Sequence, residues 1–226
     1  MAANEGADMH TRFLDRVDAG RQLAVKLAKY AGPEVLVLAL PRGGVPVAAE
    51  VARALRAPLD VLVVRKLGLP GNEELAVGAI ASGGWRVVNT AVVKEHGVSV
   101  RTLATVAARE RRELVRREKI YRAGRPAPAL RGQTVILVDD GVATGSSMRV
   151  AVATLREAKV GRLIAAAPVM ARESYFELRA AADECVALTI PREFHTVGEF
   201  YVDFAQTTDE EVGGLLAGAG VVLADG

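Results

Sequence analysis

Two adjacent acidic residues, Asp139 and Asp140, stand between an apolar run and a segment of small and hydroxyl-bearing residues. The apolar run covers residues 135–138, and the segment consists of Gly141, Val142, Ala143, Thr144, Gly145, Ser146 and Ser147. Small residues let backbone N–H groups converge on an anion, and a helix that starts after them adds partial positive charge. The segment is therefore suited to bind a phosphate group.

The two carboxylates restrict what else that ligand carries. They would repel a phosphate placed beside them, but they accept hydrogen bonds from hydroxyl groups farther along the ligand or bind a cation. A sugar with vicinal hydroxyls and a terminal phosphate meets both requirements. The alternative is a turn in which Thr144 or Ser146 only caps a helix. Capping needs one such residue and leaves the acid pair without a role, so we favour a sugar-phosphate site.

A second candidate anion site lies earlier in the chain, in the sequence Leu40-Pro41-Arg42-Gly43-Gly44. It follows an apolar run at residues 35–40 and precedes a helical pattern at residues 45–55, so that backbone N–H groups lie beside a cation. Pro-Arg-Gly-Gly alone is more often a plain turn. Its place at the end of a strand, well before the acidic segment, favours a second anion site.

A third segment, residues 65–74, combines cations with Gly and Pro residues that permit hinge motion. If it closes over the site, the ammonium group of Lys66 would stabilise negative charge most strongly once water is excluded. The alternative is a solvated loop with ordinary surface charges. We expect a mobile loop here that leads into a β-ribbon, formed by residues 75–81 and 85–88 around a Ser-Gly-Gly turn.

The sequence from Val135 to Ser147 closely resembles the phosphoribosyl-pyrophosphate (PRPP) signature of the type I phosphoribosyltransferases, with four apolar residues, two acids and a small-residue turn. The resemblance implies that the ribose hydroxyls bind to the two acids and that the 5-phosphate binds to the turn after them. It also implies that the other two segments form the pyrophosphate site, with Arg42, Gly43, Gly44 and Lys66. In that family the peptide bond that corresponds to Pro41-Arg42 is often cis.

The same resemblance implies a reaction. The chain would be a phosphoribosyltransferase that transfers the 5-phosphoribosyl group from PRPP to a small-molecule acceptor, expected to be a nitrogenous base, and releases pyrophosphate. Its catalytic residues would be Arg42, Lys66 and Asp140. Its cofactor would be Mg²⁺ carried by PRPP, with Asp139 and Asp140 as candidate protein ligands. Relatives that act on 6-oxopurines have an acid at the position of Ala143, and this chain does not, so the acceptor stays open.

Two other functions stay open from the sequence. One is a non-catalytic regulator that senses PRPP or a nucleotide, and the other is a hydrolase of sugar phosphates. A long charged helix predicted at residues 99–122 keeps an RNA-binding regulator open, but it lacks the aromatic residues of a single-strand platform. In a late loop, His195 is a candidate acceptor contact, and Phe194 or Phe200 would stack on a base if not used in the core.

Apolar runs that predict buried strands alternate with patterns that predict helices. Strands are predicted at residues 35–40, 59–64, 134–138, 163–169 and 185–190, and helices at residues 45–55, 148–158 and 172–182. The alternation predicts an α/β fold with a mainly parallel central sheet flanked by helices. The family resemblance adds a small hood to this fold.

We expect a single domain over residues 1–226, with its core at about residues 35–190. An N-terminal helix at residues 11–30 and a C-terminal tail at residues 191–226 would form the hood or a dimer contact, and we expect a homodimer. Residues 213–220 are too rich in glycine to predict a helix, while residues 221–223 would suit a strand.

Composition narrows the class of protein. The formal net charge is only +2, so a nucleic-acid partner or an anionic membrane surface is not expected. Cys185 is the single cysteine, which agrees with a reducing compartment. The polar N-terminal residues do not resemble a secretory signal, and no apolar stretch is long enough to span a membrane. The expected location is the cytoplasm.

Overall fold

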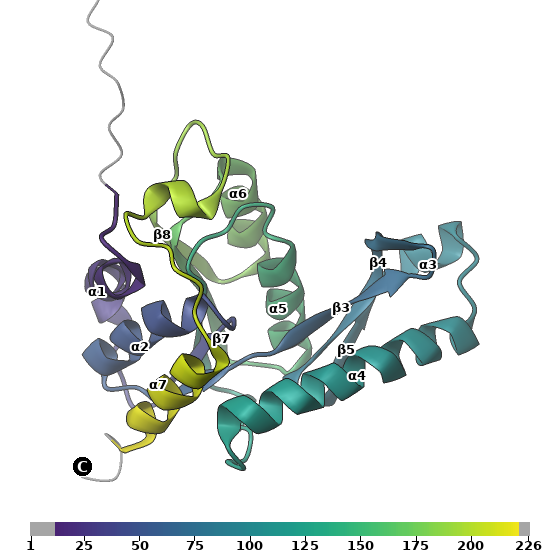
Figure 1. The fold of residues 1–226 in the computed structure, drawn as a ribbon, viewed down its shortest axis with the longest axis horizontal. Helices are drawn as coiled ribbons and strands as arrows, with labels where there is room; N and C mark the ends of the chain where they lie inside the picture. Colours follow the sequence, from purple (N-terminus) through teal and green to yellow (C-terminus); the bar gives the residue numbers. More distant parts are fainter. Residues whose placement is uncertain (1–11, 222–226) are drawn as a thin grey trace, which may run out of the picture.

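The central sheet consists of short aliphatic strands whose buried faces suit parallel strands covered by helices. The structure, a computed structural model, describes residues 12–221. All five strands pair in parallel in the order β2-β1-β6-β7-β8. Their bounds are β1 (Val35–Ala39), β2 (Leu59–Val61), β6 (Thr134–Val138), β7 (Arg162–Val169) and β8 (Glu184–Thr189). Figure 1 shows β7 and β8 of this sheet between the helices on its two sides. The predicted α/β fold with a parallel sheet flanked by helices is confirmed.

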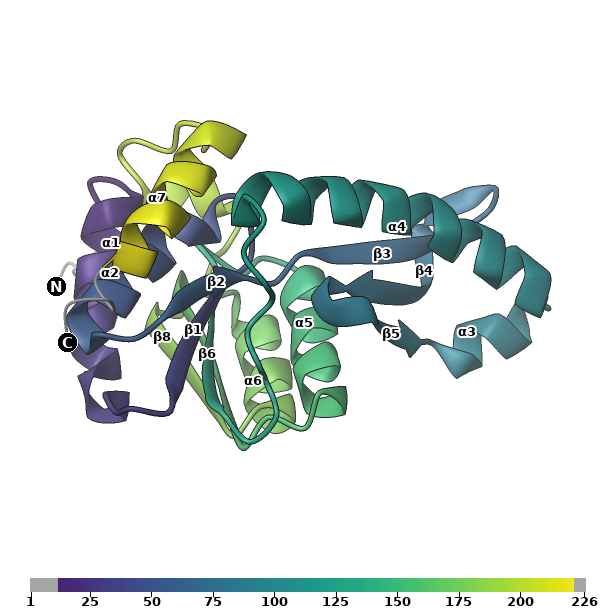
Figure 2. The ribbon, with the colours of Figure 1, turned by 90° about the horizontal axis from the view of Figure 1, so that it is seen from below.

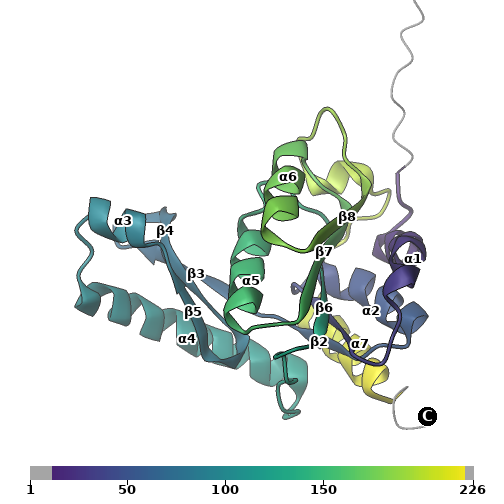
Figure 3. The ribbon, with the colours of Figure 1, turned by 180° about the vertical axis from the view of Figure 1, so that it is seen from behind.

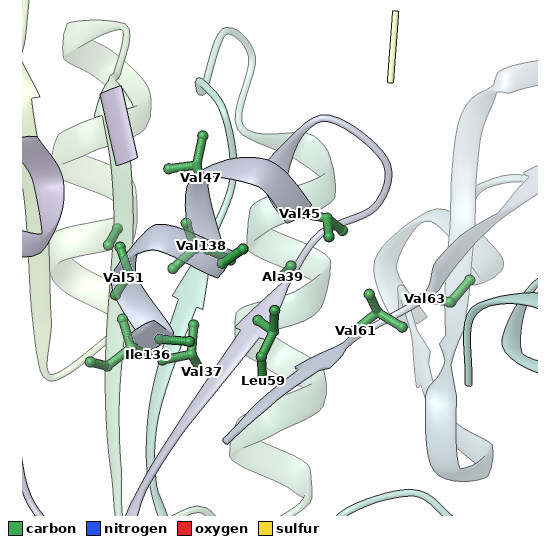
Figure 4. Close-up of a cluster of buried hydrophobic side chains, with 14 of the residues drawn as sticks. Val37, Ala39, Val45, Val47, Val51, Leu59, Val61, Val63, Ile136 and Val138 are labelled. Atoms are coloured by element: carbon green, nitrogen blue, oxygen red, sulfur yellow. The ribbon is translucent and has the colours of Figure 1, made fainter. Parts of the chain in front are cut away.

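Helices cover both faces of this sheet (Figure 3). They are α1 (Arg16–Leu27) and α2 (Gly44–Leu55) on one face and α5 (Ser146–Glu157) and α6 (Arg172–Ala181) on the other. Successive strand residues point to opposite faces, so Val37 and Ile136 pack on the α2 side while Leu38 and Leu137 pack on the α5 side. Figure 4 shows part of the first cluster, with Val37 and Ile136 near Val51 of α2.

The strand order creates a switch point between β1 and β6. The chain leaves β1 into α2 on one face and leaves β6 into α5 on the opposite face. The loops that follow these neighbouring strands therefore diverge at the carboxyl edge of the sheet, which is where open α/β sheets bind ligands. These loops, residues 40–43 and 139–145, are the first two segments that the sequence singled out.

An arm projects from this core (Figure 2). It contains an antiparallel sheet of β3 (Val64–Leu69), β4 (Asn72–Ala81) and β5 (Trp85–Val88), followed by α3 (Thr90–Glu95) and α4 (Val100–Arg122). The predicted β-ribbon around the short turn η2 (Ser82–Gly84) is confirmed. The predicted mobile loop at residues 65–74 is wrong, because most of it forms β3 and the start of β4. Leu67 and Val77 are fully buried in the cluster that includes α4, which stabilises this pairing.

The N-terminal helix is shorter than predicted. Asp15 caps α1 by accepting a hydrogen bond from the Asp18 N–H, so the helix begins at Arg16, and a 3-10 turn, η1 (Ala28–Tyr30), follows it. Phe13 instead forms a bridge with Tyr201 of the tail. The predicted start at residue 11 lies outside the described residues.

The tail is more ordered than its glycine content predicts. It contains η3 (Val197–Phe200) and α7 (Asp209–Val221). Val212 and Leu216 of α7 are fully buried, and this packing offsets the helix cost of the glycines. The predicted strand at residues 221–223 is wrong at residue 221, which belongs to α7, and its remainder lies outside the described residues. Across residues 12–221, no helix has both the length and the apolar character needed to span a membrane.

Candidate functional site

The start of α5 is open to an anion. Gly145 is its N-cap residue, has a φ of +67°, and provides no side-chain cap. The interpretation in which Thr144 or Ser146 only caps the helix is therefore wrong, and the Thr144 hydroxyl instead donates to the Ser146 hydroxyl at 3.3 Å. Thr144 and Ser147 are exposed and Ser146 is half-buried, so hydroxyls and the helix N-terminus face the same solvent-accessible place.

Neighbouring elements hold the backbone of this loop in place. The Val142 N–H donates to the carbonyl of Val169 at 2.9 Å, and the Ala171 N–H donates to the carbonyl of Val142 at 2.8 Å. The Ser174 hydroxyl, which is buried, donates to the carbonyl of Ala143 at 2.6 Å. The loop is thus fixed by β7 and α6 before any ligand binds.

The acid pair occupies the first two positions of the loop. The Asp140 N–H donates to Asp139 Oδ1 at 2.9 Å. Burial, and then the neighbouring Asp140 charge, raise the pKa of Asp139 well above its usual value. Arg16 Nε donates to Asp140 Oδ2 at 2.8 Å, and the two side chains are only 12% and 14% exposed. The Tyr201 hydroxyl donates to the Asp140 carbonyl at 2.5 Å.

The loop after β1 touches the acid pair directly. A Cβ atom at Gly43 would lie 2.0 Å from Asp140 Oδ2, and one at Gly44 would lie 2.8 Å from the Val138 carbonyl oxygen. Only glycine allows so close an approach at these two positions. The peptide bond between Pro41 and Arg42 is cis, as the resemblance to the type I phosphoribosyltransferases implied. The two predicted anion loops therefore meet over the ends of β1 and β6.

Arg42 is held much more loosely than Asp140. Its Nη1 atom lies 3.9 Å from Asp209 Oδ1 at the start of α7, and both side chains are 37% exposed. Asp209 is itself fixed, because the hydroxyl of the buried Tyr121 donates to Asp209 Oδ1 at 2.8 Å. Burial, and then this hydrogen bond, raise the pKa of Tyr121 to about 12.

Lys66 reaches the same site from the arm. Successive residues of β3 point to opposite faces, and Arg65 binds Glu110 of α4, with Nη2 2.6 Å from Oε2. Lys66 therefore points away from α4, and its Nζ donates to Ser146 Oγ at 2.7 Å. The structure thus places Arg42, Lys66 and the acid pair around one junction, although the predicted roles of these residues stay predictions.

The late-loop candidates have other partners. His195 is 76% exposed and its Nδ1 lies 3.4 Å from Glu199 Oε2. Phe200 is 5% exposed and belongs to the core, so the idea that it stacks on a base is wrong. Phe194 packs against Phe200, with ring centroids 5.3 Å apart.

Among the residues that contact the predicted loops, Arg16, Tyr201 and Asp209 were missed from the sequence. Arg16 and Asp140 are separated by 124 positions, and no local motif marks such a pair. The acidic start of α7 was a usable signal for Asp209, because acids are favoured in the first turn of a helix. It was obscured by the glycines that follow.

The comparisons with known proteins agree with this geometry. The model of the phosphoribosyl transferase domain matches residues 10–205, so the chain belongs to that family. Two Mycobacterium tuberculosis proteins, from strains CDC 1551 / Oshkosh and ATCC 25618 / H37Rv, are provisionally named phosphoribosyl transferases. Each is 46% identical to the chain over 200 residues, which are 88% of this chain and 45% of the relative. The chain thus spans less than half the length of these curated relatives.

A crystal structure supports the same overall arrangement. The protein TT1426 from Thermus thermophilus is 45% identical to this chain and superimposes with a TM-score of 0.82. The match covers 91% of this chain and 97% of that protein. The fold described above therefore corresponds to a known arrangement over most of the chain.

Proposed function

We propose that this chain transfers the 5-phosphoribosyl group of PRPP to a nitrogenous base and releases pyrophosphate. The observation that carries the proposal is the junction of two anion loops and Lys66 at the switch point of the sheet. Membership of the phosphoribosyl transferase domain family supports the same reaction type. In the reaction, the bond between the ribose anomeric carbon and a pyrophosphate oxygen breaks as a bond to the acceptor nitrogen forms.

Each group of site residues has a separate task in this proposal. The N–H groups and hydroxyls at residues 143–147 bind the 5-phosphate, while Asp139 and Asp140 accept hydrogen bonds from the ribose hydroxyls. Arg42 and Lys66 neutralise the departing pyrophosphate, so they act most strongly as its charge develops. Catalysis then consists mainly of positioning and of charge complementarity.

Mg²⁺ fits this site only as a partner of the substrate. Among residues 12–221, no group of three or more His, Cys, Asp or Glu side chains is arranged to hold a metal ion. The ion usually binds phosphate oxygens with one or two carboxylates and several waters, and Asp139 and Asp140 would be those carboxylates. When bound, it would supply positive charge to the pyrophosphate.

The RNA-binding alternative rests on the basic side chains of α4, and several of these have acidic partners within the protein. Arg116 and Arg117 of α4 both pair with Glu113, at 2.8 Å each. Arg122 is buried and pairs with Asp60 at 3.0 Å. These arginines are therefore bound within the protein, and we propose no second function. The cytoplasmic location and the homodimer stay expectations from the sequence.

The test is to incubate the protein with PRPP, Mg²⁺ and a panel of nitrogenous bases, and to follow pyrophosphate and the new nucleotide by mass spectrometry. A nucleotide product in stoichiometric amount with pyrophosphate supports transfer. Pyrophosphate released with ribose 5-phosphate and no nucleotide would indicate a hydrolase. PRPP binding without turnover across the panel would favour the sensing regulator.

A further inference from the structure

We call the loop at residues 139–145 the sugar loop, after its proposed ligand. Its second acid, Asp140, is held by a residue from a distant part of the chain. We propose that Arg16 positions Asp140 for the ribose hydroxyls, so that the start of α1 and residues 201–205 belong to the sugar site. This inference rests on the proposed function, because it assumes that Asp140 receives the sugar.

Three contacts fix the Arg16 guanidinium. Its Nε donates to Asp140 Oδ2 at 2.8 Å, and its Nη1 donates to the Ala205 carbonyl at 2.7 Å. Its central carbon lies 3.9 Å from the ring centroid of Phe204, which in turn stacks on Tyr201 at 4.9 Å. A planar guanidinium suits this combination of stacking and directed hydrogen bonds, which an ammonium group would not reproduce.

The backbone of Gly43 also restricts the position of the Asp140 carboxylate. The carboxylate lies against Gly43, where a Cβ atom would be 2.0 Å from Oδ2 and 3.1 Å from Oδ1. The carboxylate is thus clamped between the guanidinium of Arg16 and the backbone of the loop after β1. Arg16 engages Oδ2, and in this proposal Oδ1 is the atom that accepts from a hydroxyl group. The contacts with Arg16 and Gly43 therefore orient the Asp140 carboxylate, and Oδ1 remains the proposed acceptor for the sugar.

Charge explains why Arg16 should remain when a sugar binds. Burial and the neighbouring Asp140 charge raise the pKa of Asp139, whereas the charge of Arg16 acts in the opposite direction and favours the ionised acceptor. Hydroxyl groups are neutral donors and form weaker hydrogen bonds to a carboxylate than a guanidinium does. Loss of Arg16 would also leave Asp140 as a largely buried charge without a partner. The sugar therefore binds beside the pair and does not replace it.

The first test compares Arg16→Gln with Arg21→Gln, a matched change in the same helix. Arg21 pairs with Glu50 at 3.3 Å and is 69% exposed. Calorimetry with ribose 5-phosphate and with inorganic phosphate separates sugar recognition from phosphate recognition. We expect Arg16→Gln to weaken ribose 5-phosphate binding by about tenfold, or about 1.4 kcal/mol, with inorganic phosphate unchanged. Arg21→Gln should change neither affinity.

A double-mutant cycle distinguishes positioning from a general structural role. If Arg16 acts through Asp140, adding Arg16→Gln to Asp140→Asn should cause no further loss of ribose 5-phosphate affinity. An equal loss in both backgrounds, or equal losses for both ligands, would overturn the inference. Arg16→Lys keeps the charge and should fall between the wild type and Arg16→Gln; if Arg16→Gln does not fold, an unchanged Arg16→Lys would overturn it.

Failure of the sugar-phosphate assignment, on which the proposed function depends, gives a different result. In that case the wild-type protein would bind ribose 5-phosphate no more tightly than inorganic phosphate. If the wild type does prefer ribose 5-phosphate and Arg16→Gln retains the full preference, only the role of Arg16 is wrong.

Discussion

The two loops at the switch point hold their charged residues in opposite ways. Asp140 of the sugar loop is about 14% exposed and bound by Arg16 at 2.8 Å. Arg42 belongs to the loop at residues 40–43, which we propose to bind pyrophosphate and call the pyrophosphate loop. It is 37% exposed and lies 3.9 Å from Asp209. The first arrangement fixes an acceptor in advance. The second leaves a cation free to exchange a weak protein partner for a phosphate group.

The difference follows from how firmly the two partners, Arg16 and Asp209, are themselves held. Arg16 is stacked on Phe204 and bound to the Ala205 carbonyl, so its position is fixed independently of Asp140. Asp209 stands at the exposed start of α7 and has Tyr121 as its second partner. An exposed pair at this distance contributes little to stability, typically about 0–1 kcal/mol. We therefore expect the two loops to respond very differently to mutation.

The largest effect is expected at Arg42 of the pyrophosphate loop and at Lys66 of β3. Arg42→Ala and Lys66→Ala should each lower turnover with the true acceptor by about 10²–10³, because each removes a charge contact that matters most as pyrophosphate departs. Binding of a nucleoside monophosphate, which has no pyrophosphate, should change little in Arg42→Ala. In Lys66→Ala it should fall far less than turnover, since Nζ also contacts Ser146. Steady-state kinetics and calorimetry measure the two quantities. Arg53→Ala, an exposed change in α2, is the control, and wild-type turnover in either site variant would refute the assigned roles.

The next effect concerns the acid pair. Asp139→Asn combined with Asp140→Asn should weaken ribose 5-phosphate binding by roughly 1.5–3 kcal/mol in total, because each Asn keeps a neutral acceptor. Inorganic phosphate should bind nearly as before, since the carboxylates do not face the phosphate. Calorimetry with both ligands checks this. Equal losses for the two ligands would show that the acids do not recognise the sugar.

A smaller effect is expected from filling the phosphate site. Thr144→Trp with Ser147→Trp should abolish most of the thermal stabilisation that a nucleoside monophosphate gives, because bulky groups block the N-terminus of α5. The melting temperature with and without ligand measures it. Thr105→Trp, at an exposed position of α4, should keep the full stabilisation. Unchanged stabilisation in the double variant would place the phosphate elsewhere.

The smallest effect has the opposite sign. Asp209→Asn removes an anion beside Arg42, so pyrophosphate should bind slightly more tightly, by at most about 1 kcal/mol. Calorimetry with pyrophosphate measures the change. A tenfold weakening instead would mean that Asp209 positions Arg42 as firmly as Arg16 positions Asp140, and the contrast between the loops would not hold.

Much of the site was predictable because it is local in the sequence. The apolar run before Asp139 and the small residues after Asp140 specify a strand, a loop and a helix in direct succession. The glycines of the other loop were noticed as part of an anion-binding turn. The structure adds a second need for them, since Gly43 and Gly44 approach the sugar loop closely. Their contact also depended on β1 and β6 being neighbours, which the alternating pattern permitted but did not specify.

The remaining features depend on packing between distant segments. Lys66 was assigned to a mobile loop, but Leu67 beside it is buried under α4 and makes the segment a strand. The glycine-rich segment of α7 is helical because Val212 and Leu216 are buried. Arg16 and Asp140 are 124 positions apart, and only the tertiary structure brings them together. Single-sequence periodicity contains no information on such long-range pairs.

The most direct test of the sugar site is a crystal structure of the protein with bound ribose 5-phosphate. The account predicts the phosphate at the N-terminus of α5, within hydrogen-bond distance of the backbone at residues 144–147. It also predicts the ribose hydroxyls on Asp139 and Asp140, with Arg16 still bound to Asp140. A phosphate seated instead on Arg42 and Gly43, with the acid pair facing no hydroxyl, would contradict the account.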